Sequence, residues 1–242
     1  MMILCLCVPL EMPKRRRAPT SPIDLANRKN DEEFARDYLV PGSAESTSPW
    51  VVSWTHPRTG DEYNISLARS SNLEAEALGA CFGLIEQTSA DHYRNSAGKW
   101  RPRKKMEEMR SPEMRYILVR DKKSNTIRGF TSLMPTYEGG EPVIYCYEIH
   151  LDPSLQGTGL GSLLMSFHST VAQNLPPVTK VMLTCFLSNQ RGLDFYRKLG
   201  FEEDAISPEP RDLRNGKRFL PDYVILSKTI RPASDSGAEK HA

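Results

Sequence analysis

The sequence predicts an α/β or α+β fold: one domain with a mixed, mostly antiparallel sheet flanked by helices. Strand-like segments follow one another between residues 115 and 151 with only short breaks, which is typical of an antiparallel meander. An apolar helical repeat then separates them from a strand at 180–187, which indicates one parallel crossover. With 242 residues, 39% of them hydrophobic, the chain can bury a sizeable core.

The first part of the domain has the patterns of a helix and a strand pair. Residues 23–39 show the weak apolar stripe of a polar surface helix, and a loop rich in Ser and Pro follows at 40–49. Two strand-like segments, 50–54 and 62–68, flank the turn signal PRTGD. We therefore expect a surface helix followed by two paired strands.

A long helix is expected after these strands. Its apolar residues recur with helical spacing: Leu78, Cys81, Phe82 and Ile85. Ser71 and Glu74 have the spacing of a capping box in front of it. The segment 93–109 is polar, basic and unevenly patterned, and it predicts a loop or lid with a helix at its end.

The second half alternates strands and helices. The expected elements are strands at 115–121, 126–137, 142–152, 180–187 and 222–230, with helices opening at Leu160 and Asn189. The first of these helices has a strong apolar repeat: Leu160, Leu163, Leu164, Phe167 and Val171. Gly200 is expected to close the second helix in the left-handed conformation.

The two ends lack the patterns of folded elements. We expect a disordered basic leader at 1–22, the domain at 23–230 and a disordered tail at 231–242. The leader's apolar run is far shorter than the roughly 20 residues that span a bilayer, and its basic residues follow that run instead of preceding it, unlike a secretion signal. Residues 14–17, KRRR, form either a nuclear import signal or a solvated charge cluster.

Composition argues against several classes of site. The net charge of +2 does not indicate direct nucleic-acid binding. Cys81, Cys146 and Cys185 lie in separate apolar stretches, and the chain has no CxxC pair. We therefore expect buried free thiols in a reducing compartment, without a metal site or a disulfide framework.

A glycine-rich turn, QGTGLG, stands directly before the apolar helix at Leu160. Gly157, Gly159 and Gly161 leave backbone N–H groups bare at the positive end of a helix dipole, which suits a phosphate or pyrophosphate. The alternative is a tight turn that lets helix and strand pack closely. A dinucleotide fingerprint fits poorly, because the third glycine comes one residue early and the preceding strand carries Glu148.

The turn resembles the Q/R-x-x-G-x-G/A signature of the GCN5-related N-acetyltransferases, with Gln156, Gly159 and Gly161 in the defining places. The later segment NQRGLDFYRKLGF resembles the Asn-led helix of the same family. This resemblance implies the GNAT fold, whose central strands are splayed. It also implies acetyl-CoA as co-substrate, with its pyrophosphate at the turn, and no metal.

A narrower resemblance is to the NatD-type N-alpha-acetyltransferases. It is carried by LANR, YRNSAGKW, VIYCYEIHL, KVMLTCFLSN, FYRKLGFEEDAISP and DYVILSK, and it extends from about Leu25 to Lys228. It implies acetylation of the amino-terminal serine of histones that begin Ser-Gly-Arg-Gly. The partners would be histone amino-terminal tails, the protein a monomer without membrane contact, and its location the nucleus and cytoplasm.

Glu148 is the candidate general base. By the two-residue period of a strand, Ile144, Cys146, Glu148 and His150 share one face, so the carboxylate would be desolvated beside apolar groups. The resemblance also matches Glu148 to the family's base. The alternatives are a Glu paired with a buried Arg and a Glu at a solvated strand edge. His150 either tunes the base or is a packed structural histidine.

The resemblance implies further site residues. Tyr223 would be a general acid or position the serine. Substrate contacts would come from Tyr93, Trp100, Tyr145, Tyr147 and Tyr223. The family's first lid tryptophan is absent near Gly98, and Thr136 replaces a family aspartate; Glu138 and Glu141 either compensate for this or are solvated loop charges.

The cofactor contacts implied by the resemblance surround the turn. Backbone groups of Ile149, His150 and Leu151 would hold the acetyl end, and Thr184 and Asn189 the pantetheine arm, while Asn189 also caps a helix. The turn itself would contribute Gln156, Gly157, Thr158, Gly159, Leu160 and Gly161.

Two other functions stay open at this point. The same fold can acylate lysine side chains or a small amine, or it can be a non-catalytic module that binds acyl-CoA. A basic substrate would suit an acidic rim, and the segment 201–210, FEEDAISPEP, is the candidate for one.

Overall fold

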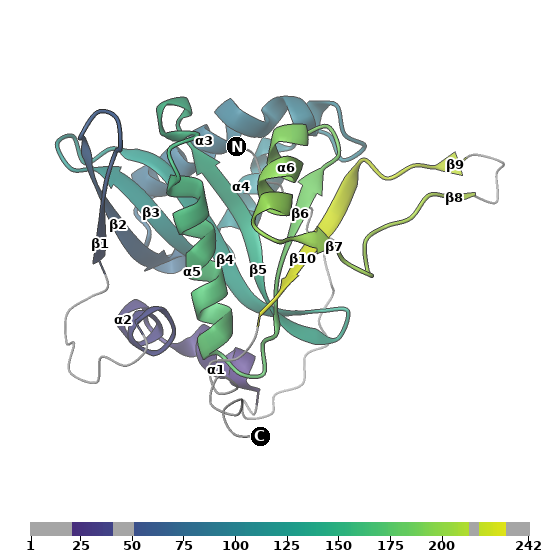
Figure 1. Ribbon diagram of the computed structural model, residues 1–242, viewed down its shortest axis with the longest axis horizontal. Helices are drawn as coiled ribbons and strands as arrows, with labels where there is room; N and C mark the ends of the chain where they lie inside the picture. The colour runs from purple at the N-terminus through teal and green to yellow at the C-terminus, as the bar shows by residue number, and fades with distance from the viewer. Residues whose placement is uncertain (1–20, 41–50, 213–217, 231–242) are drawn as a thin grey trace, which may run out of the picture.

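A computed structural model of the protein describes residues 21–40, 51–212 and 218–230 (Figure 1). The basic stretch 14–17 and the tail at 231–242 lie outside the described residues, as do the predicted leader up to residue 20 and the predicted loop from residue 41.

The described part holds a central sheet of eight strands in the order β1-β2-β3-β4-β5-β6-β10-β7. Its strands are β1 (Val51–Thr55), β2 (Glu62–Arg69), β3 (Arg115–Asp121), β4 (Ile127–Glu138), β5 (Glu141–Leu151), β6 (Lys180–Phe186), β7 (Glu202–Glu203) and β10 (Tyr223–Thr229). Every neighbouring pair is antiparallel except β5 and β6, so the predicted mixed sheet with one parallel crossover is confirmed.

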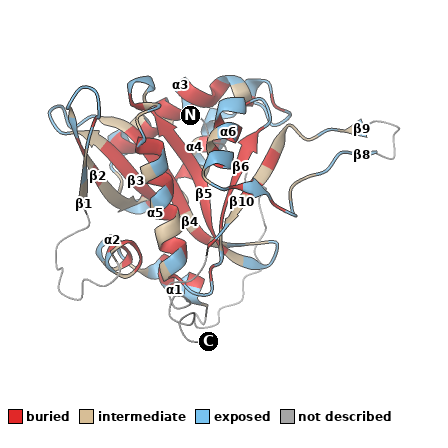
Figure 2. Ribbon diagram, viewed as in Figure 1, coloured by how far each residue is buried: buried red, intermediate tan, exposed pale blue. Residues whose placement is uncertain are grey.

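Helices cover both faces of this sheet. They are α1 (Pro22–Arg28), α2 (Asp31–Phe34), the π-helical turn η1 (Ala35–Leu39), the 3-10 turns η2 (Ser70–Asn72) and η3 (Pro153–Leu155), α3 (Ala75–Arg94), α4 (Pro102–Met109), α5 (Leu160–Asn174) and α6 (Gln190–Lys198). In Figure 1, α5 and α6 lie in front of the sheet while α3 and α4 lie behind it. The strands between these layers are largely buried, as Figure 2 shows.

The core divides into two clusters that follow these layers. One contains apolar residues of α1, η1, α5 and α6 and the front face of the sheet, including Leu160, Leu164 and Tyr196. The other contains residues of α3, α4 and the rear face, including Leu78 and Met109. The apolar residues that repeat along α3 and α5 are therefore buried against the sheet, as their spacing predicts.

Two sequence predictions about local structure were wrong, and three short strands were missed. Residues 23–39 do not form one helix, because Asn30 and Glu33 make a capping box that starts a new one at Asp31. α3 begins at Ala75 with Glu74 as N-cap and no side-chain cap, so Ser71 and Glu74 do not form the expected capping box. The short strands β7, β8 (Arg211–Asp212) and β9 (Arg218–Phe219) were not predicted, since two residues carry no periodic signal.

A buried arginine attaches the amino-terminal helices to the sheet. Arg115 on β3 is 0% exposed and lies 4.0 Å from the ring centre of Phe34. Its guanidinium donates to the carboxylate of Asp31 at 3.1 Å and to the carbonyls of Ala26 and Lys29. Burial lowers the pKa of Arg115 to about 10, which leaves it charged at neutral pH. The charge is thus neutralised by fixed groups of one small helical region.

The two central strands separate partway along their length. The parallel pairing of β5 with β6 runs from Val143 and Lys180 to Cys146 and Leu183, although β5 continues to Leu151 and β6 to Phe186. This is the splay expected of the fold. Within the described residues, no helix is long and apolar enough to cross a membrane.

Candidate active site

A β-bulge in β5 determines which side chains enter the site. Ser132 on β4 pairs with Glu148, and Leu133 pairs with Cys146, so Tyr147 is an extra residue in the ladder. Beyond the bulge, the even-numbered side chains of β5 point to the opposite face of the sheet from those before it. The prediction that Ile144, Cys146, Glu148 and His150 share a face was therefore wrong.

The two faces of β5 have different companions. Ile144 and Cys146 pack in the front cluster with Ile149 and Leu151. Tyr145 and Tyr147 belong to the rear cluster, and Glu148 and His150 contact α4 and α3 on that same side. The carboxylate is buried as expected, but among polar and charged groups instead of beside Ile144 and Cys146.

Glu148 is 2% exposed, and its two oxygens meet different partners. Oε1 makes an ion pair with Nζ of Lys105 on α4, and Oε2 lies 2.5 Å from Nε2 of His150. The alternative of a buried Arg partner was therefore wrong in the identity of the cation, which is Lys105, and the alternative of a solvated strand edge was wrong because Glu148 is buried. A carboxylate between an ammonium and an imidazole is well placed to exchange protons.

Lys105 places an ammonium in a small cage. Its Nζ lies 2.8 Å from Oε1 of Glu108 and 5.7 Å from the ring centre of Tyr93, besides its contact with Glu148. Burial acts to lower the pKa of Lys105, but the nearby Glu148, Tyr93 and Glu108 more than offset this and raise it well above its ordinary value. The side chain is therefore a buried cation.

Sequence reasoning missed both Lys105 and Glu108. They stand in the run RPRKKMEEM, where charged residues are normally solvated. The i,i+3 spacing of the two residues was the only sequence signal, and it indicates no more than a helical ion pair.

His150 connects the carboxylate to α3. It is 0% exposed, and its Nδ1 lies 2.6 Å from Oγ1 of Thr88. The hydroxyl of Thr88 in turn donates to the carbonyl of Leu84 at 2.7 Å. His150 is thus packed as expected and also contacts Glu148, while a role in tuning the base stays a prediction.

The predicted substrate residues come together in the rear cluster. Its members include Tyr93, Tyr145 and Tyr147, with Trp100 and Tyr223 packed against them. The ring of Tyr93 lies 4.9 Å from that of Trp100, and the rings of Tyr145 and Tyr147 are 5.1 Å apart. Burial raises the pKa of Tyr93 well above its ordinary value, so its hydroxyl stays neutral. Their contacts with a substrate stay a prediction.

The segment between α3 and α4 is anchored over this cluster. The backbone N–H of Ala97 donates to Oδ2 of Asp222 at 2.6 Å, next to Tyr223 on β10. Nδ1 of His92 lies 2.6 Å from Oγ of Ser188, on the loop after β6. The first contact fixes the predicted lid to the opposite side of the site, and the second fixes the end of α3 there.

The glycine turn has the backbone that its sequence predicts. Gly157 has φ 71° and Gly159 has φ 88°, which side chains rarely allow. A Cβ atom at either glycine would meet nothing within 4 Å, so close packing does not explain them. Gly159 caps α5 without a side-chain hydrogen bond, which leaves the first helical N–H groups available to an anion.

Neighbouring side chains stabilise this turn. Nε2 of Gln156 donates to the carbonyl of Leu151 at 3.1 Å, and the hydroxyl of Thr158 donates to the carbonyl of Leu155 at 2.6 Å. Gln156 therefore joins the turn to the end of β5. Its side chain is placed to position the turn, whatever further contact it makes with a ligand.

Two pockets lie beside the side chains that contact the partners of Glu148, although Glu148 itself lines neither. One, of about 330 Å³, is lined by residues of α3, the glycine turn and the start of α6, among them Thr88, Gln156, Asn189 and Arg191. The other, of about 300 Å³, borders Tyr147, Met134 and α4, including Glu108. Because His150 contacts Thr88 and Lys105 contacts Glu108, the buried carboxylate reaches both pockets through one intervening side chain.

Of the remaining cofactor candidates, Asn189 lines the first pocket and Thr184 does not. Oδ1 of Asn189 accepts from the N–H of Gly192 at 3.0 Å, so its predicted helix cap is confirmed. Oγ1 of Thr184 lies 2.6 Å from Oη of Tyr145, where β5 and β6 separate. Gly200 has φ 83° and closes α6 as predicted. The roles of Thr184 and Asn189 toward a cofactor stay predictions.

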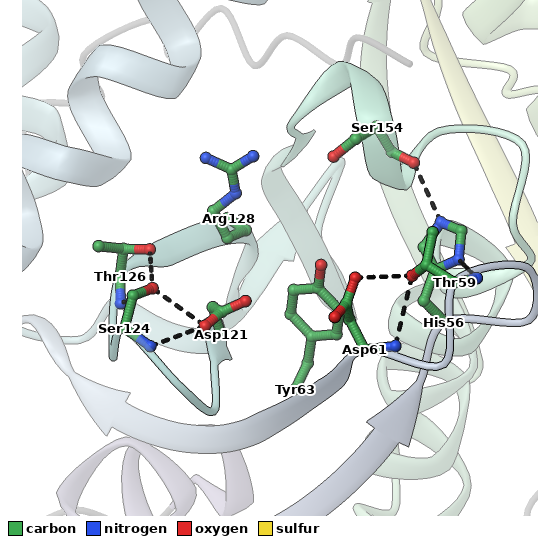
Figure 3. Close-up of a pocket in the computed structure, with 9 residues that line it drawn as sticks. All are labelled: His56, Thr59, Asp61, Tyr63, Asp121, Ser124, Thr126, Arg128 and Ser154. Carbon is green, nitrogen blue, oxygen red and sulfur yellow. Dashed lines mark hydrogen bonds between the residues drawn. The ribbon is translucent and has the colours of Figure 1, made fainter.

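A third pocket, of about 280 Å³, lies at the turns that join β1 to β2 and β3 to β4 (Figure 3). Its acidic side chains are engaged by their own loops: Asp121 accepts from Ser124, and Asp61 accepts from Thr59. None of the predicted site residues lines it. The pocket is therefore not the candidate site.

The predicted acidic rim at 201–210 is only partly exposed. Asp204 is buried, accepts from the N–H of Ile206 at 3.1 Å and lies 3.5 Å from Nζ of Lys180. Glu141 pairs with the same lysine at 2.7 Å. Asp204 therefore stabilises its own loop, and the exposed carboxylates of the rim are those of Glu202, Glu203 and Glu209.

The three described cysteines, Cys81, Cys146 and Cys185, are buried and free, as predicted. Burial raises the pKa of each thiol to about 12, so none is a thiolate at neutral pH. Among the described residues, no group of three or more His, Cys, Asp or Glu side chains is placed to hold a metal ion.

Comparisons with known proteins agree with this geometry. N-alpha-acetyltransferase 40 of Saccharomyces cerevisiae is 31% identical over 158 residues, which cover 56% of this chain and 55% of that protein. The chain thus matches about half the length of this curated relative.

Solved structures share the fold. The GNAT domain of S. lividans PAT has a TM-score of 0.53 at 12% identity, covering 75% of this chain and 97% of its own. Arabidopsis thaliana NAA60 in complex with a bisubstrate analogue has a TM-score of 0.50 at 13% identity, covering 69% and 98%. Residues 80–201, half of the chain, match the Acetyltransferase (GNAT) family. The splayed sheet, the bare glycine turn and this match together show that the protein belongs to the acetyltransferase (GNAT) family.

Proposed function

We propose that the protein is an N-alpha-acetyltransferase that transfers acetyl from acetyl-CoA to the amino-terminal serine of histone tails beginning Ser-Gly-Arg-Gly. One observation supports this most directly. Oε1 of the buried Glu148 already faces an ammonium, that of Lys105, between the two pockets. A substrate's terminal ammonium would find the same carboxylate and the same Tyr93 ring in its place.

The residues that would hold acetyl-CoA extend from the first pocket, which Gln156 and Asn189 line, to the glycine turn and the end of β5. The N–H groups at the start of α5 and the open space beside Gly157 and Gly159 suit a pyrophosphate. The splay after Cys146 leaves the end of β5, residues 149–151, beyond the β6 ladder, where its backbone can bond the acetyl end. When bound, acetyl-CoA supplies an activated thioester carbonyl.

The protein's own part in the reaction is to remove a proton and to orient the amine. An α-amino group has an ordinary pKa of about 8, against about 10.4 for lysine, so a terminal amine needs less help from the base. Glu148 accepts the proton from the ammonium, which frees the nitrogen lone pair for the acetyl carbonyl. Tyr223, at the edge of the aromatic cluster, orients the serine or protonates the leaving thiolate.

Access to Glu148 requires Lys105 to leave Oε1. Lys105 lies on α4, a helix of eight residues joined to the anchored lid. We therefore place the substrate's entry at the second pocket, between α4 and Tyr147, where the terminal ammonium exchanges with that of Lys105. Thr136 and Gly98 alter the family pattern near the peptide, and the exposed Glu202 and Glu203 offer charge to a following arginine.

The test is mass spectrometry of a Ser-Gly-Arg-Gly peptide after incubation with acetyl-CoA, with the added group mapped to the α- or an ε-nitrogen. We expect the α-nitrogen to be acetylated and an amino-terminally blocked peptide to be inert. Acetylation of the blocked peptide on lysine would instead identify a lysine enzyme. Binding of CoA without product on any peptide would identify a non-catalytic module.

A further inference from the structure

A buried run of hydrogen bonds extends from α3 to the candidate base. It begins at the carbonyl of Leu84, passes through the hydroxyl of Thr88 and the ring of His150, and ends at Oε2 of Glu148. All three side chains are at most 9% exposed. In the proposed acetyl transfer Glu148 is the base, and the imidazole of His150 has no role yet.

The hydroxyl of Thr88 determines which ring nitrogen of His150 carries a proton. A hydroxyl has a single proton, and that of Thr88 is donated to Leu84 at 2.7 Å. Oγ1 can then only accept from Nδ1 of His150, at 2.6 Å. Nδ1 therefore bears hydrogen in both charge states of the ring, and Nε2 is the nitrogen that gains or loses a proton.

The contact between Nε2 and Oε2 requires a shared proton. The two atoms are 2.5 Å apart, and both are acceptors when the ring is neutral and the carboxyl group is ionised. Two facing lone pairs at this distance would repel each other. The pair formed by Glu148 and His150 therefore holds one proton, as imidazole and carboxylic acid or as imidazolium and carboxylate, and is neutral as a unit in either form.

We propose that His150 is a positioning residue that lets Glu148 act as a base through both of its oxygens; this rests on the proposed function. The substrate's N–H bond breaks as an O–H bond forms at Oε1. At the same time the O–H bond at Oε2 breaks and an N–H bond forms at Nε2. The carboxyl group keeps one proton throughout, the positive charge moves from the ammonium to the imidazolium, and the amine becomes neutral.

This arrangement resolves a difficulty of the buried site. The resting pair is neutral, so Glu148 need not hold an isolated negative charge when Lys105 leaves Oε1. The positive charge ends on a ring whose Nδ1–H is already bonded to Thr88, and Thr88 borders the first pocket. The proton thus arrives on the α4 side and is held on the α3 side.

Among the residues that the structure describes, few other titratable groups lie around the pair. They are Lys105 and Glu108 on α4, Tyr93 on α3, Tyr116 on β3, Cys146 on β5 and Tyr196 on α6. Burial raises the pKa of the three tyrosines and of Cys146, which therefore stay neutral, and Lys105 stays charged. Burial also raises the pKa of Glu108, so this carboxyl group needs a control of its own.

The test is the pH dependence of kcat/KM for the peptide. A free carboxyl group titrates about 2 units below a free imidazole. In His150→Gln the side chain cannot store a proton, so we expect kcat to fall at least about 10-fold and the acidic limb to move to lower pH. Thr88→Val should shift the limb in the same direction, and Thr88→Ser should restore it. Glu108→Gln measures the contribution of that neighbour separately.

Thr170→Val is the matched control, because Thr170 on α5 also donates its hydroxyl to the carbonyl four residues earlier, at 3.0 Å, away from the site. The acidic limb of the pH profile of Thr170→Val should lie at the same pH as that of the wild type. An unchanged limb and kcat in His150→Gln would overturn the proposal.

A second readout does not depend on activity. Nitrogen-15 NMR of the neutral His150 ring should show the proton on Nδ1, and Glu148→Gln should shift the Nε2 signal. A neutral ring protonated on Nε2 would overturn the proposal. If instead the wild type transfers nothing to an α-amine yet shows the Nδ1–H form, the proposed function is wrong while the hydrogen-bonded pair stands.

Discussion

Two buried cations, Arg115 and Lys105, have opposite kinds of surroundings. Arg115 bonds to backbone carbonyls and one carboxylate and lies against Phe34, all within the region that joins α1 and α2 to the sheet. Lys105 has two carboxylates and a tyrosine face, and it lies on a short helix at the edge of a pocket. Both are almost fully buried, at 0% and 4% exposed.

These surroundings indicate that the charge of Arg115 is structural, whereas the ammonium of Lys105 can be replaced by another ammonium. The backbone carbonyls that bond Arg115 are held in place by the helical region, so they bind this guanidinium and are not free to bind another group. The carboxylates around Lys105 would serve any ammonium, including one that arrives with a substrate. Burial of a charge therefore does not distinguish the two roles, whereas the nature and mobility of the partners does.

Glu148→Gln, which changes the carboxylate that Lys105 contacts, has the largest expected effect on activity. It keeps the size of the side chain and removes the proton acceptor, so we expect kcat to fall by about 10² to 10⁴-fold with little change in acetyl-CoA affinity. Steady-state kinetics and calorimetric titration with CoA measure the two quantities. Glu62→Gln, in an exposed ion pair on β2, is the control and should keep wild-type kcat. Full activity of Glu148→Gln would remove Glu148 as the base.

Arg115→Met tests the structural side. It leaves Asp31 and the carbonyls of Ala26 and Lys29 without their buried donor, so we expect the free energy of unfolding to fall by about 3–5 kcal/mol. Urea denaturation measures this loss, and the folded fraction should retain its kcat. Lys122→Met, in an exposed pair, should cost at most about 1 kcal/mol. A comparable loss in both variants would contradict the structural role.

Gly159→Val tests whether the glycine turn binds a ligand or only supports the fold. In the first case it resembles the surroundings of Lys105, and in the second those of Arg115. A side chain there enters open space and strains a backbone with φ 88°. Losing one hydrogen bond to a charged phosphate corresponds to about 10 to 100-fold weaker acetyl-CoA binding.

Gly60→Val is the matched control for that variant. Gly60 has φ 74° with open space around it, and it lies in the turn between β1 and β2. It should lose a similar amount of stability but bind acetyl-CoA normally. Equal CoA affinity in both variants would reduce the glycine turn to a structural role.

Lys105→Met has the smallest expected effect and sharpens the comparison most. If the lysine occupies the substrate's place nine-tenths of the time, its removal lowers the peptide KM by about 10-fold. This gain is the opposite of what removal of Arg115 produces. A rise in the peptide KM would show that Lys105 supports the substrate instead of competing with it.

Much of the fold was predictable because its signals are local. The apolar repeats of α3 and α5, the meander of β3 to β5 and the left-handed Gly200 each follow from residues close together in the sequence. Predictions failed where a local pattern was not decisive, as at Asn30, whose capping box divides the first helix.

In the site, the sequence by itself determined the candidate base and the bare glycine turn, since each has a distinctive residue type or spacing, whereas the aromatic residues were implied only by the family resemblance. Only the tertiary structure decided their arrangement. The bulge at Tyr147 depends on how β4 pairs with β5, and it turns Glu148 and His150 to the face of α3 and α4. The contacts of Glu148 with Lys105 and of His150 with Thr88 join residues 43 and 62 positions apart, and no periodicity along a chain specifies such distant pairs.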